Sequence, residues 1–187
     1  RWCVVSVPID PWAAKIFPEL APHAAVNSLW EAIYKSLRIT GDGNAVARWQ
    51  EHIERTARRS AKLNELKLTS LHYQNGLGTD LTIGLPVGAI WMGGAEEAAD
   101  GVQFVAKMPT EAIFTAPHRD RVNGKEYSAM PFVLNGNLTH AFALTFKDGK
   151  IVGNEAENGR ENALFHSQMH GDEGGSSLGQ VCVVPSH

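Results

Sequence analysis

The sequence predicts an α+β fold in which helices come first along the chain and antiparallel strands follow. Two observations lead to this prediction. Helical periodicity fills roughly the first third of the chain, and from about Leu66 the apolar segments become short and are separated by glycines. Helices followed by runs of strands are typical of α+β proteins. The change of pattern falls near residues 64–68.

The amino-terminal stretch is expected to form a strand and then a short helix. Trp2–Pro8 is rich in β-branched residues, like strands that are buried on both faces of a parallel sheet. Asp10 precedes Pro11, which predicts an N-cap followed by the first helical position. We therefore expect a short helix over residues 12–17.

Two longer amphipathic helices are predicted next. Over about residues 24–38, apolar residues recur at i, i+3, i+4 and i+7 and form one stripe: Trp30, Ile33, Tyr34 and Leu37. After a break at Gly41–Gly43, a second helix is expected to bury Val46, Trp49, Ile53 and Ala57. Its solvent face carries two i,i+4 pairs, Glu51/Arg55 and Glu54/Arg58.

The remaining chain is predicted to be mainly β-structure. The expected strands are 70–74, 79–85, 89–92, 102–107, 127–134, 139–146, 150–153 and 179–184. Asn135-Gly136 and Asp148-Gly149 each separate two of these segments, and such dipeptides supply the positive φ angles of tight hairpins. Antiparallel pairing is therefore expected. One further helix is predicted over 157–170, with Leu164 and Phe165 pointing inward.

Composition excludes several classes of protein. The chain has 17 Lys plus Arg against 20 Asp plus Glu, so its net charge of −3 leaves no basic excess for nucleic acid. Neither a membrane-spanning run nor a signal segment is recognised, which predicts a cytoplasmic protein without a membrane partner. Cys3 and Cys182 lie in β-branched runs, and we expect buried, reduced thiols rather than a disulfide framework.

Sequence motifs give little support for nucleotide hydrolysis, thiol redox chemistry or a zincin-type zinc site. A Gly-rich phosphate loop and a Cys-x-x-Cys pair are both absent from the sequence. His166 and His170 have the i,i+4 spacing of two zinc ligands on a helix. However, Ser167 stands where a zincin has its glutamate, so an exposed histidine pair is favoured over a zinc site.

Two further residues are candidates for binding. His118 lies in the polar loop Ala116–Arg121, where loops commonly display ligand-binding residues, although a hydrogen-bonded loop would look the same. Glu111 follows Thr110 after an apolar segment. Its residue type and position fit either a charge at a helix N-terminus or a metal ligand.

Longer sequence motifs point to one protein family. Four segments carry the resemblance in sequence order: Gly78–Pro86, Met108–Gly124, Leu144–Val152 and Asp172–Val181. They resemble the thermophilic metallo-aminopeptidase family, which includes aminopeptidase T, aminopeptidase S and PepS-like enzymes. The resemblance extends over nearly the whole chain, because Trp2–Val5 and the helix around Leu29 also match the preceding stretch of that family.

The resemblance implies release of N-terminal amino acids from peptides at a centre of two divalent metal ions, which could be zinc, cobalt, manganese or magnesium. It implies that Glu111 is one metal carboxylate. His118, the candidate from the polar loop, is then expected to contact the peptide substrate. The second carboxylate belongs to a Leu-Gly-Glu-Val word, which here is Leu178-Gly-Gln-Val181. Gln180 therefore offers a neutral amide where an anion is expected, and metal affinity should fall.

The resemblance also predicts a middle fragment of a longer protein. The family's other ligands, two histidines, a tyrosine and an aspartate, lie downstream of the Gln180 word, and Arg1 is not an initiator methionine. We expect residues 1–66 to be the C-terminal part of an α/β N-terminal domain and residues 67–187 to be an incomplete β-rich metal-site domain. A homo-oligomer, as a dimer, is expected because uncovered apolar faces seldom stay solvated.

Two other interpretations stay open. Gln180 favours a non-catalytic binding or structural module that kept the fold and lost its ligands. A third, weaker hypothesis is an unrelated β-rich metallohydrolase that uses His118 and Glu111.

Overall fold

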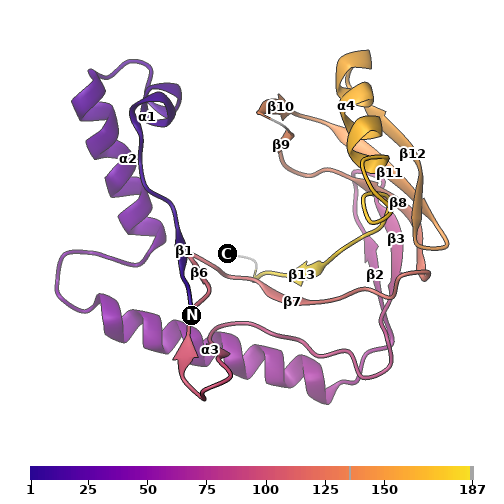
Figure 1. Cartoon of the computed structure of the whole chain (residues 1–187), viewed down its shortest axis with the longest axis horizontal. Coiled ribbons are helices and arrows are strands. Elements are labelled where there is room, and N and C mark those ends of the chain that lie inside the picture. Colours follow the sequence, from indigo (N-terminus) through magenta and orange to yellow (C-terminus); the bar gives the residue numbers. More distant parts are fainter. Residues whose placement is uncertain (135, 186–187) are drawn as a thin grey trace. The chain divides into compact units, whose positions relative to one another are not determined.

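The computed structural model describes residues 1–134 and 136–185. Its helices are α1 (Asp10–Ile16), α2 (Pro22–Ser36), α3 (Ala45–Glu65) and α4 (Gly159–Met169), labelled in Figure 1. Its strands are β1 (Val4–Val5), β2 (Ser70–Gln74), β3 (Asp80–Gly84), β4 (Glu96–Glu97), β5 (Gln103–Phe104), β6 (Lys107–Met108), β7 (Ile113–Thr115), β8 (Val122–Tyr127), β9 (Phe132–Leu134), β10 (Asn137–Thr139), β11 (Phe142–Lys147), β12 (Lys150–Ala156) and β13 (Val181–Val183). In the described part of the chain, no helix has the length and apolar character needed to cross a bilayer.

The chain divides into two compact units that do not follow sequence order. Of the described residues, unit 1 contains 1–62, 92–113 and 183–185, and unit 2 contains 63–91, 114–134 and 136–182. The α+β class is confirmed, because three of the four helices precede an antiparallel sheet. The domain boundary expected after residue 66 concerns the family's domains and stays a prediction.

In unit 1, α1 packs against α2 through a small apolar core. Ala13 of α1 meets Ala25, Leu29 and Ile33 of α2, all of which are buried. The predicted helix is confirmed, but its buried stripe was placed wrongly, because Tyr34 is 42% exposed. Small residues at positions 13 and 25 allow close approach of the two helices, and the buried residues of α2 lie on the Ala25–Leu29–Ile33 side.

The start of α1 also differs from expectation. Ile9 is the N-cap residue, and Asp10 is the first helical residue and makes no side-chain capping bond. Its carboxylate still lies in the first turn, where the helix dipole favours a negative charge.

The long helix α3 is confirmed, but it buries a different face from the predicted one. Its buried side chains are Trp49, His52, Thr56 and Ser60, whereas Val46 is 71% exposed. The hydroxyls of Thr56 and Ser60 donate to the carbonyls of His52 (2.9 Å) and Ala57 (3.0 Å), so these polar groups can be buried at little cost.

The close approach of the loop at Gly93 explains why small side chains occupy that face. A Cβ at Gly93 would lie 2.9 Å from Thr56 Cγ2, so the loop chain runs directly over this side of α3. The predicted ion pairs on the solvent face are present, with Glu51 3.8 Å from Arg55 and Glu54 3.7 Å from Arg58.

The first strand is parallel, as expected, but it is not buried. β1 pairs with β6 over two residues, and Val4 and Val5 are 59% and 49% exposed. Both cysteines, Cys3 and Cys182, are exposed, so the prediction of buried thiols was wrong. A strand of two residues with one short neighbour gives its side chains few partners in the described chain.

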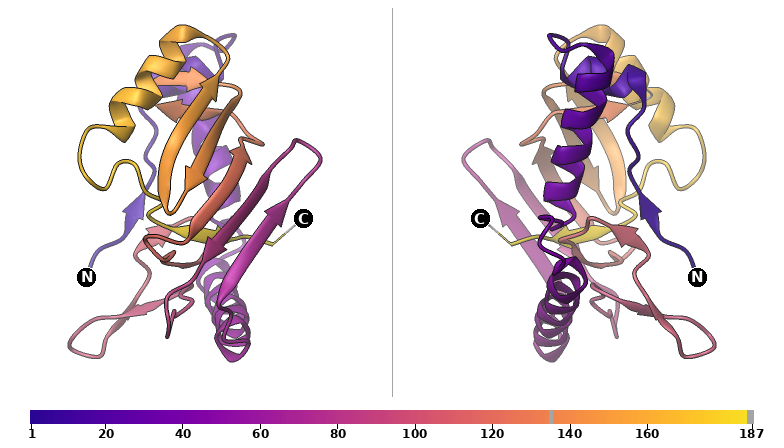
Figure 2. Two further views of the ribbon diagram at one scale, coloured as in Figure 1. Left: turned by 90° about the vertical axis from the view of Figure 1, so that its right-hand side faces the viewer. Right: turned by 90° about the vertical axis from the view of Figure 1, so that its left-hand side faces the viewer.

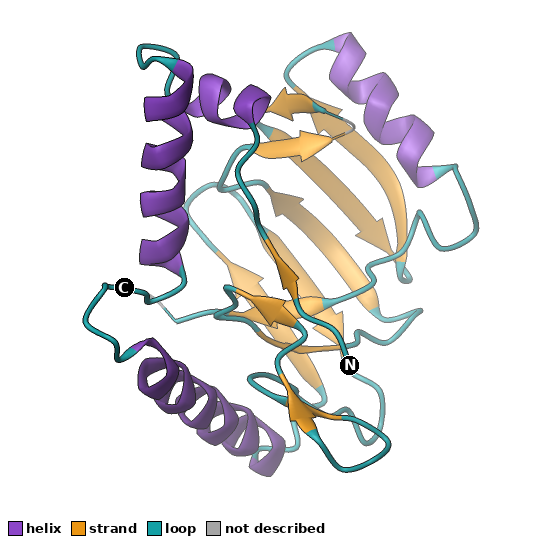
Figure 3. Ribbon diagram, turned by 60° about the vertical axis from the view of Figure 1, so that its left-hand side comes forward, coloured by secondary structure: helices purple, strands orange, loops and turns teal. Residues whose placement is uncertain are grey.

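Unit 2 is built on a five-stranded antiparallel sheet, which is among the orange strands of Figure 3. The strand order is β12-β11-β8-β3-β2, with the labels of Figure 1. The register places Leu71 opposite Ile83 and Ile83 opposite Val122. The next row on the same face joins Tyr73 to Leu81 and Leu81 to Gly124. Because side chains alternate along a strand, these rows belong to one apolar face, which we call the inner face.

Helix α4 packs beside β12, as Figure 2 shows. The side chain of Asn158 caps the helix by accepting from the backbone N–H of Glu161 at 3.0 Å. Phe165 and Met169 are buried with Leu134, and Leu164 packs at the edge of this cluster. The predicted helix and its inward side chains are therefore confirmed.

The turns follow the sequence signals where they are described. Asp148 and Gly149 have φ angles of 48° and 81° and join β11 to β12, which confirms this hairpin. The other predicted turn includes Asn135, which lies outside the described residues. β9 and β10, on either side of it, pair antiparallel.

Several predicted strands were wrong in extent. The strand expected over 139–146 is divided between β10 and β11, and the strands expected over 150–153 and 179–184 are longer and shorter, respectively, than predicted.

Three other predicted strands differ more. Residues 89–92 form no named strand, because the side chain of Asn64 binds the backbone N–H and C=O of Trp91 at 2.8 and 3.0 Å. Residues 102–107 are divided between β5 and β6. The strand expected over 127–134 is replaced by β8, which starts earlier in a segment that looks like a polar loop, and by β9.

Gly124 makes the early start of β8 possible. Its φ angle is 121°, and an added Cβ would overlap the carbonyl oxygen of Asp80 on β3. A residue without a side chain is therefore required for β8 to pair with its neighbour.

We expect Gly124→Ala to destabilise the protein by about 1–3 kcal/mol or more, because backbone strain and steric overlap coincide. Gly88→Ala is the matched control, since Gly88 also has a positive φ angle (76°) but no atom lies within 4 Å of the place that its added methyl group would occupy. Thermal unfolding measures the loss of stability of each variant relative to the unchanged protein. Equal losses would show that the contact with Asp80 is unimportant.

Candidate functional site

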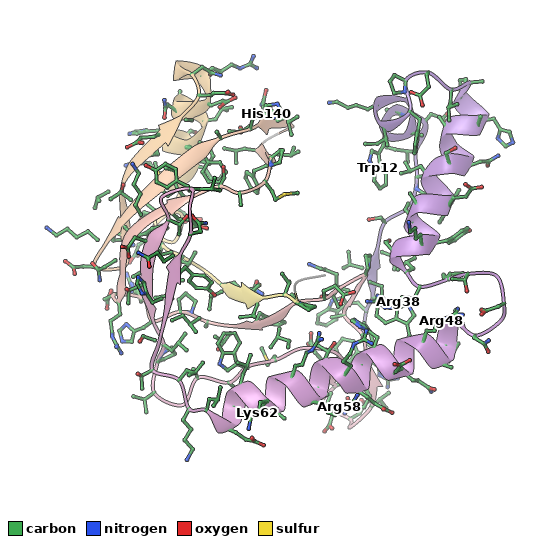
Figure 4. The ribbon with its side chains drawn as sticks, turned by 180° about the vertical axis from the view of Figure 1, so that it is seen from behind. Trp12, Arg38, Arg48, Arg58, Lys62 and His140 are labelled. Atoms are coloured by element: carbon green, nitrogen blue, oxygen red, sulfur yellow. The ribbon has the colours of Figure 1, made fainter. Side chains whose placement is uncertain are left out.

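In unit 1, Glu111 is held by an arginine at the end of a helix. The Arg38 guanidinium donates to the Glu111 carboxylate, whose side chain is 31% exposed. Arg38 follows the C-terminus of α2 and has a φ of 61°, an unusual angle for a residue with a side chain. It also lies over the ring of Trp49, 5.4 Å from its centroid. Figure 4 shows Arg38 near the start of α3.

His52 and Arg55 of α3 lie beside the same carboxylate. His52 Nδ1 is 3.8 Å from a Glu111 oxygen, and the opposite ring nitrogen bonds the carbonyl of Thr110 at 2.7 Å. Arg55 lies 3.2 Å from His52 Nδ1. The carboxylate therefore faces a cationic environment.

The pKa of Glu111 results from opposing effects. Burial acts to raise this pKa, but the Arg38 hydrogen bond and the electrostatic interactions with Arg38, His52 and Arg55 outweigh it, so the pKa lies below its usual value. Glu111 is thus ionised at neutral pH. Arg38 occupies one oxygen of this carboxylate, so a metal ion at that oxygen would compete with the guanidinium.

Gln180 lies in unit 2, immediately before β13, at the wall of a pocket of about 430 Å³. The pocket lies over part of the inner face and is lined by Tyr73, Gln74, Asn75, Thr79, Leu81, Ile83, Glu126, Tyr127, Ser128, Ala129, Leu178, Gln180, Val181 and Cys182. The Gln180 amide nitrogen donates to Cys182 Sγ at 3.1 Å.

Two titratable residues of this pocket were missed by the sequence analysis. Burial raises the pKa of Glu126. The pKa of Tyr73 is raised by burial first and then by electrostatic interactions with Cys182 and Glu126. Only the alternation of side chains along β8 places Glu126 on the inner face. This alternation could not be used in the prediction, because the strand was expected to begin at residue 127.

The metal centre implied by the family resemblance can be tested against these donors. Within residues 1–134 and 136–185, no three His, Cys, Asp or Glu side chains are grouped so that they could hold a metal ion. Glu111 is engaged by Arg38, and Gln180 contributes only an amide. These residues by themselves do not fit a two-metal centre.

The histidine candidates make local hydrogen bonds. The backbone N–H of Asp120 donates to His118 Nδ1 at 3.2 Å, and the backbone N–H of His118 donates to the Gly84 carbonyl at 2.7 Å. His166 and His170 stack with ring centroids 4.1 Å apart, and His170 Nδ1 lies 2.8 Å from the carbonyl oxygen of His166. A substrate contact of His118 stays a prediction.

A Gly-x-Ser-x-Gly word does occur at Gly175–Gly179, around Ser177, and it was overlooked as a possible nucleophile motif. It follows α4 rather than leading from a strand into a helix. The Ser177 hydroxyl is buried and has no hydrogen-bond partner among the described residues, so no base activates it.

Comparison with known proteins gives a consistent result. Residues 1–187 match the family described as thermophilic metalloprotease (M29). The chain is 41% identical to aminopeptidase 2 of Geobacillus stearothermophilus over 98% of its own length and 44% of that protein. It is 36% identical to aminopeptidase T of Thermus thermophilus, covering 100% of this chain and 45% of that one. The chain thus spans less than half the length of these relatives.

Solved structures agree. The wild-type AmpT structure from Thermus thermophilus superposes with a TM-score of 0.86 at 35% identity, over 98% of this chain and 44% of that chain. A 2,5-dihydroxypyridine dioxygenase from Pseudomonas putida KT2440 matches with a TM-score of 0.52 at 20% identity, over 71% of this chain and 41% of that chain. The second likeness concerns the fold alone.

The Glu111 ion pair predicts a specific dependence of stability on pH. Because the folded-state pKa of Glu111 is below the unfolded value, its contribution is complete above the unfolded pKa and is lost as pH falls through the folded pKa. We expect Glu111→Gln to lower the free energy of unfolding by about 1 kcal/mol at neutral pH, and by less in acid.

Denaturant unfolding at neutral and acidic pH measures this difference. Glu96→Gln, on the exposed strand β4 of the same unit, is the control and should have little effect. A loss for Glu111→Gln that is the same at all pH values would contradict the ion-pair interpretation.

Proposed function

We propose, from the premise that this chain belongs to the thermophilic metalloprotease (M29) family, that it forms part of a metallo-aminopeptidase that releases N-terminal amino acids from peptides. The observation that carries the proposal is the match over the whole chain to proteins named aminopeptidases. Because the chain spans 44–45% of those relatives, the activity is attributed to the whole protein.

We attribute two divalent metal ions, zinc, cobalt, manganese or magnesium, to that whole protein. Glu111 and Gln180 are the residues of this chain that we assign to the centre, with Gln180 at the family's glutamate position. His118 is assigned a contact with the peptide. The described residues include no group of three His, Cys, Asp or Glu side chains that could hold a metal ion. The remaining ligands are therefore expected from other parts of the whole protein.

The proposed partners follow from the same premise. A peptide is the substrate, and a homo-oligomer, as a dimer, in the cytoplasm is the expected form. Exposed apolar side chains on unit 1, including Trp2, Val4 and Val7, support burial against further protein.

A second candidate is a non-catalytic binding or structural module. Two observations favour it: Gln180 lacks a charge, and the Glu111 carboxylate is already paired with Arg38. A module of this kind would keep the fold and bind peptides without cleaving them.

The two candidates differ in metal-dependent turnover. The protein that carries this chain, isolated at its natural length with its intact mass measured, should release N-terminal residues from aminoacyl substrates when zinc, cobalt or manganese is added. Glu111→Gln should lower kcat/KM by about 100-fold or more, because a metal ligand is lost. Glu96→Gln should leave it unchanged. Peptide binding without turnover under any metal would support the module instead.

The 187-residue chain alone should show negligible hydrolysis with the same metals, because its described donors do not complete a centre. Turnover comparable to that of full-length relatives would defeat this explanation.

Gln180→Glu in the 187-residue chain should raise the affinity for zinc or manganese without creating activity, since one added carboxylate does not complete a metal shell. Isothermal titration with each metal measures the change. An unchanged affinity would count against the assignment of Gln180 to the metal centre.

A further inference from the structure

The pocket of unit 2 contains an acidic side chain that the proposed metal centre does not use. Glu126 lies on β8 opposite Leu144 of β11 and is half-buried. Its register places it two residues beyond Gly124, on the inner face that forms the pocket floor. Within the described part of the chain, its carboxylate makes no hydrogen bond or ion pair.

The surroundings of Glu126 offer no positive charge. None of the described residues that line the pocket is a lysine, arginine or histidine. Burial alone accounts for the raised pKa of Glu126, which indicates a carboxylate that has lost water without gaining a cation. Such a group would be stabilised by a ligand that brings the missing positive charge.

The rest of the lining favours a cation on an aliphatic stem. Apolar side chains contribute much of the wall: Leu81, Ile83, Leu178 and Val181. Tyr73 adds an aromatic ring, which can pack against a hydrocarbon chain or face a cation. A volume of about 430 Å³ is within the range of small-molecule sites.

The acceptors match an ammonium group. An ammonium has three N–H donors and no acceptor. Glu126 offers carboxylate oxygens, Tyr73 a phenolic oxygen and Gln180 an amide oxygen, while the Gln180 nitrogen is directed to Cys182. A neutral amide at position 180 is therefore compatible with this ligand.

The described lining by itself is a poor site for a bare metal ion, so the assignment of Gln180 at its wall to the metal centre depends on ligands from the rest of the whole protein. Glu126 and Cys182 are its only carboxylate or thiol groups among the described lining residues, and no group of three such side chains or histidines is found in the described chain. The apolar walls would also contribute nothing to a metal ion, whereas they would bury the carbon atoms of a side chain.

We propose that this pocket binds the basic side chain of a peptide, a lysine-like ammonium on an aliphatic stem, with Glu126 as its counter-ion. That the side chain belongs to the N-terminal residue of a substrate rests on the proposed function. Glu126 is then a residue that determines specificity.

Two ligands with the same α-amine test the pocket. L-lysinamide and L-norleucinamide have similar aliphatic stems, but only lysinamide ends in an ammonium. Their binding to the intact chain is measured by isothermal titration at neutral pH in the presence of a chelator. We expect lysinamide to bind at least about tenfold more tightly, because a charged hydrogen bond is added.

Glu126→Gln should weaken lysinamide binding by about tenfold to 100-fold and leave norleucinamide binding unchanged. Glu157→Gln, an exposed residue outside this pocket, is the matched control and should change neither. Gln180→Glu adds a carboxylate to the same wall and should tighten lysinamide binding, which tests the pocket even if Glu126→Gln fails to fold.

Equal binding of the two amides would overturn the proposal. So would lysinamide binding that a folded Glu126→Gln variant leaves unchanged, or, where that variant does not fold, lysinamide binding that Gln180→Glu leaves unchanged. Zinc binding that depends on Glu126 in a chelator-free titration, together with no binding of lysinamide, would assign the pocket to a metal instead. None of these binding measurements requires turnover. They therefore test the pocket independently, even if the proposed aminopeptidase activity is not found.

Discussion

The antiparallel register between β3 and β8 is the constraint on which the second unit depends. It requires Gly124, because a side chain there would overlap the carbonyl oxygen of Asp80. Once β8 is paired in this register, alternation along the strand directs Val122 and Glu126 to the same face. A slip of one residue would move Glu126 to the opposite face and bring Lys125, now paired with Glu155 at 2.8 Å, into the pocket.

In the first unit, the contacts of Glu111 depend on the backbone conformation at the C-terminal end of α2. Arg38 adopts a left-handed backbone there, and from that position its guanidinium reaches both the Trp49 ring and the Glu111 carboxylate. The cost of this backbone conformation is offset by a paired charge and a stacked aromatic ring. The same contact favours the ionised form of Glu111 and occupies one of its two carboxylate oxygens. A guanidinium and a divalent cation compete for one carboxylate, so the conformation of the α2–α3 connection bears on any metal that binds there.

Several features could be read from the sequence because they depend on neighbours in the chain. The four helices, the Asp148-Gly149 hairpin and the antiparallel pairing follow from periodicity and from turn residues. The predictions that were wrong concern features that depend on contacts between segments distant in the sequence. Trp91 is not in a strand because Asn64 satisfies its backbone groups, and α3 buries Thr56 and Ser60 because the chain at Gly93 lies against them. Apolar periodicity carries no information about such partners.

The sequence by itself determined the family, the α+β class and the identities of Glu111 and Gln180, because ordered words and local patterns persist whatever the packing. Only the tertiary structure decided which charges surround Glu111 and which side chains share a pocket with Gln180. Arg38 lies 73 residues from Glu111 in the chain, and Tyr73, Glu126 and Gln180 come from three separate segments. Electrostatic environment depends on distance in space, and folding alone sets that distance.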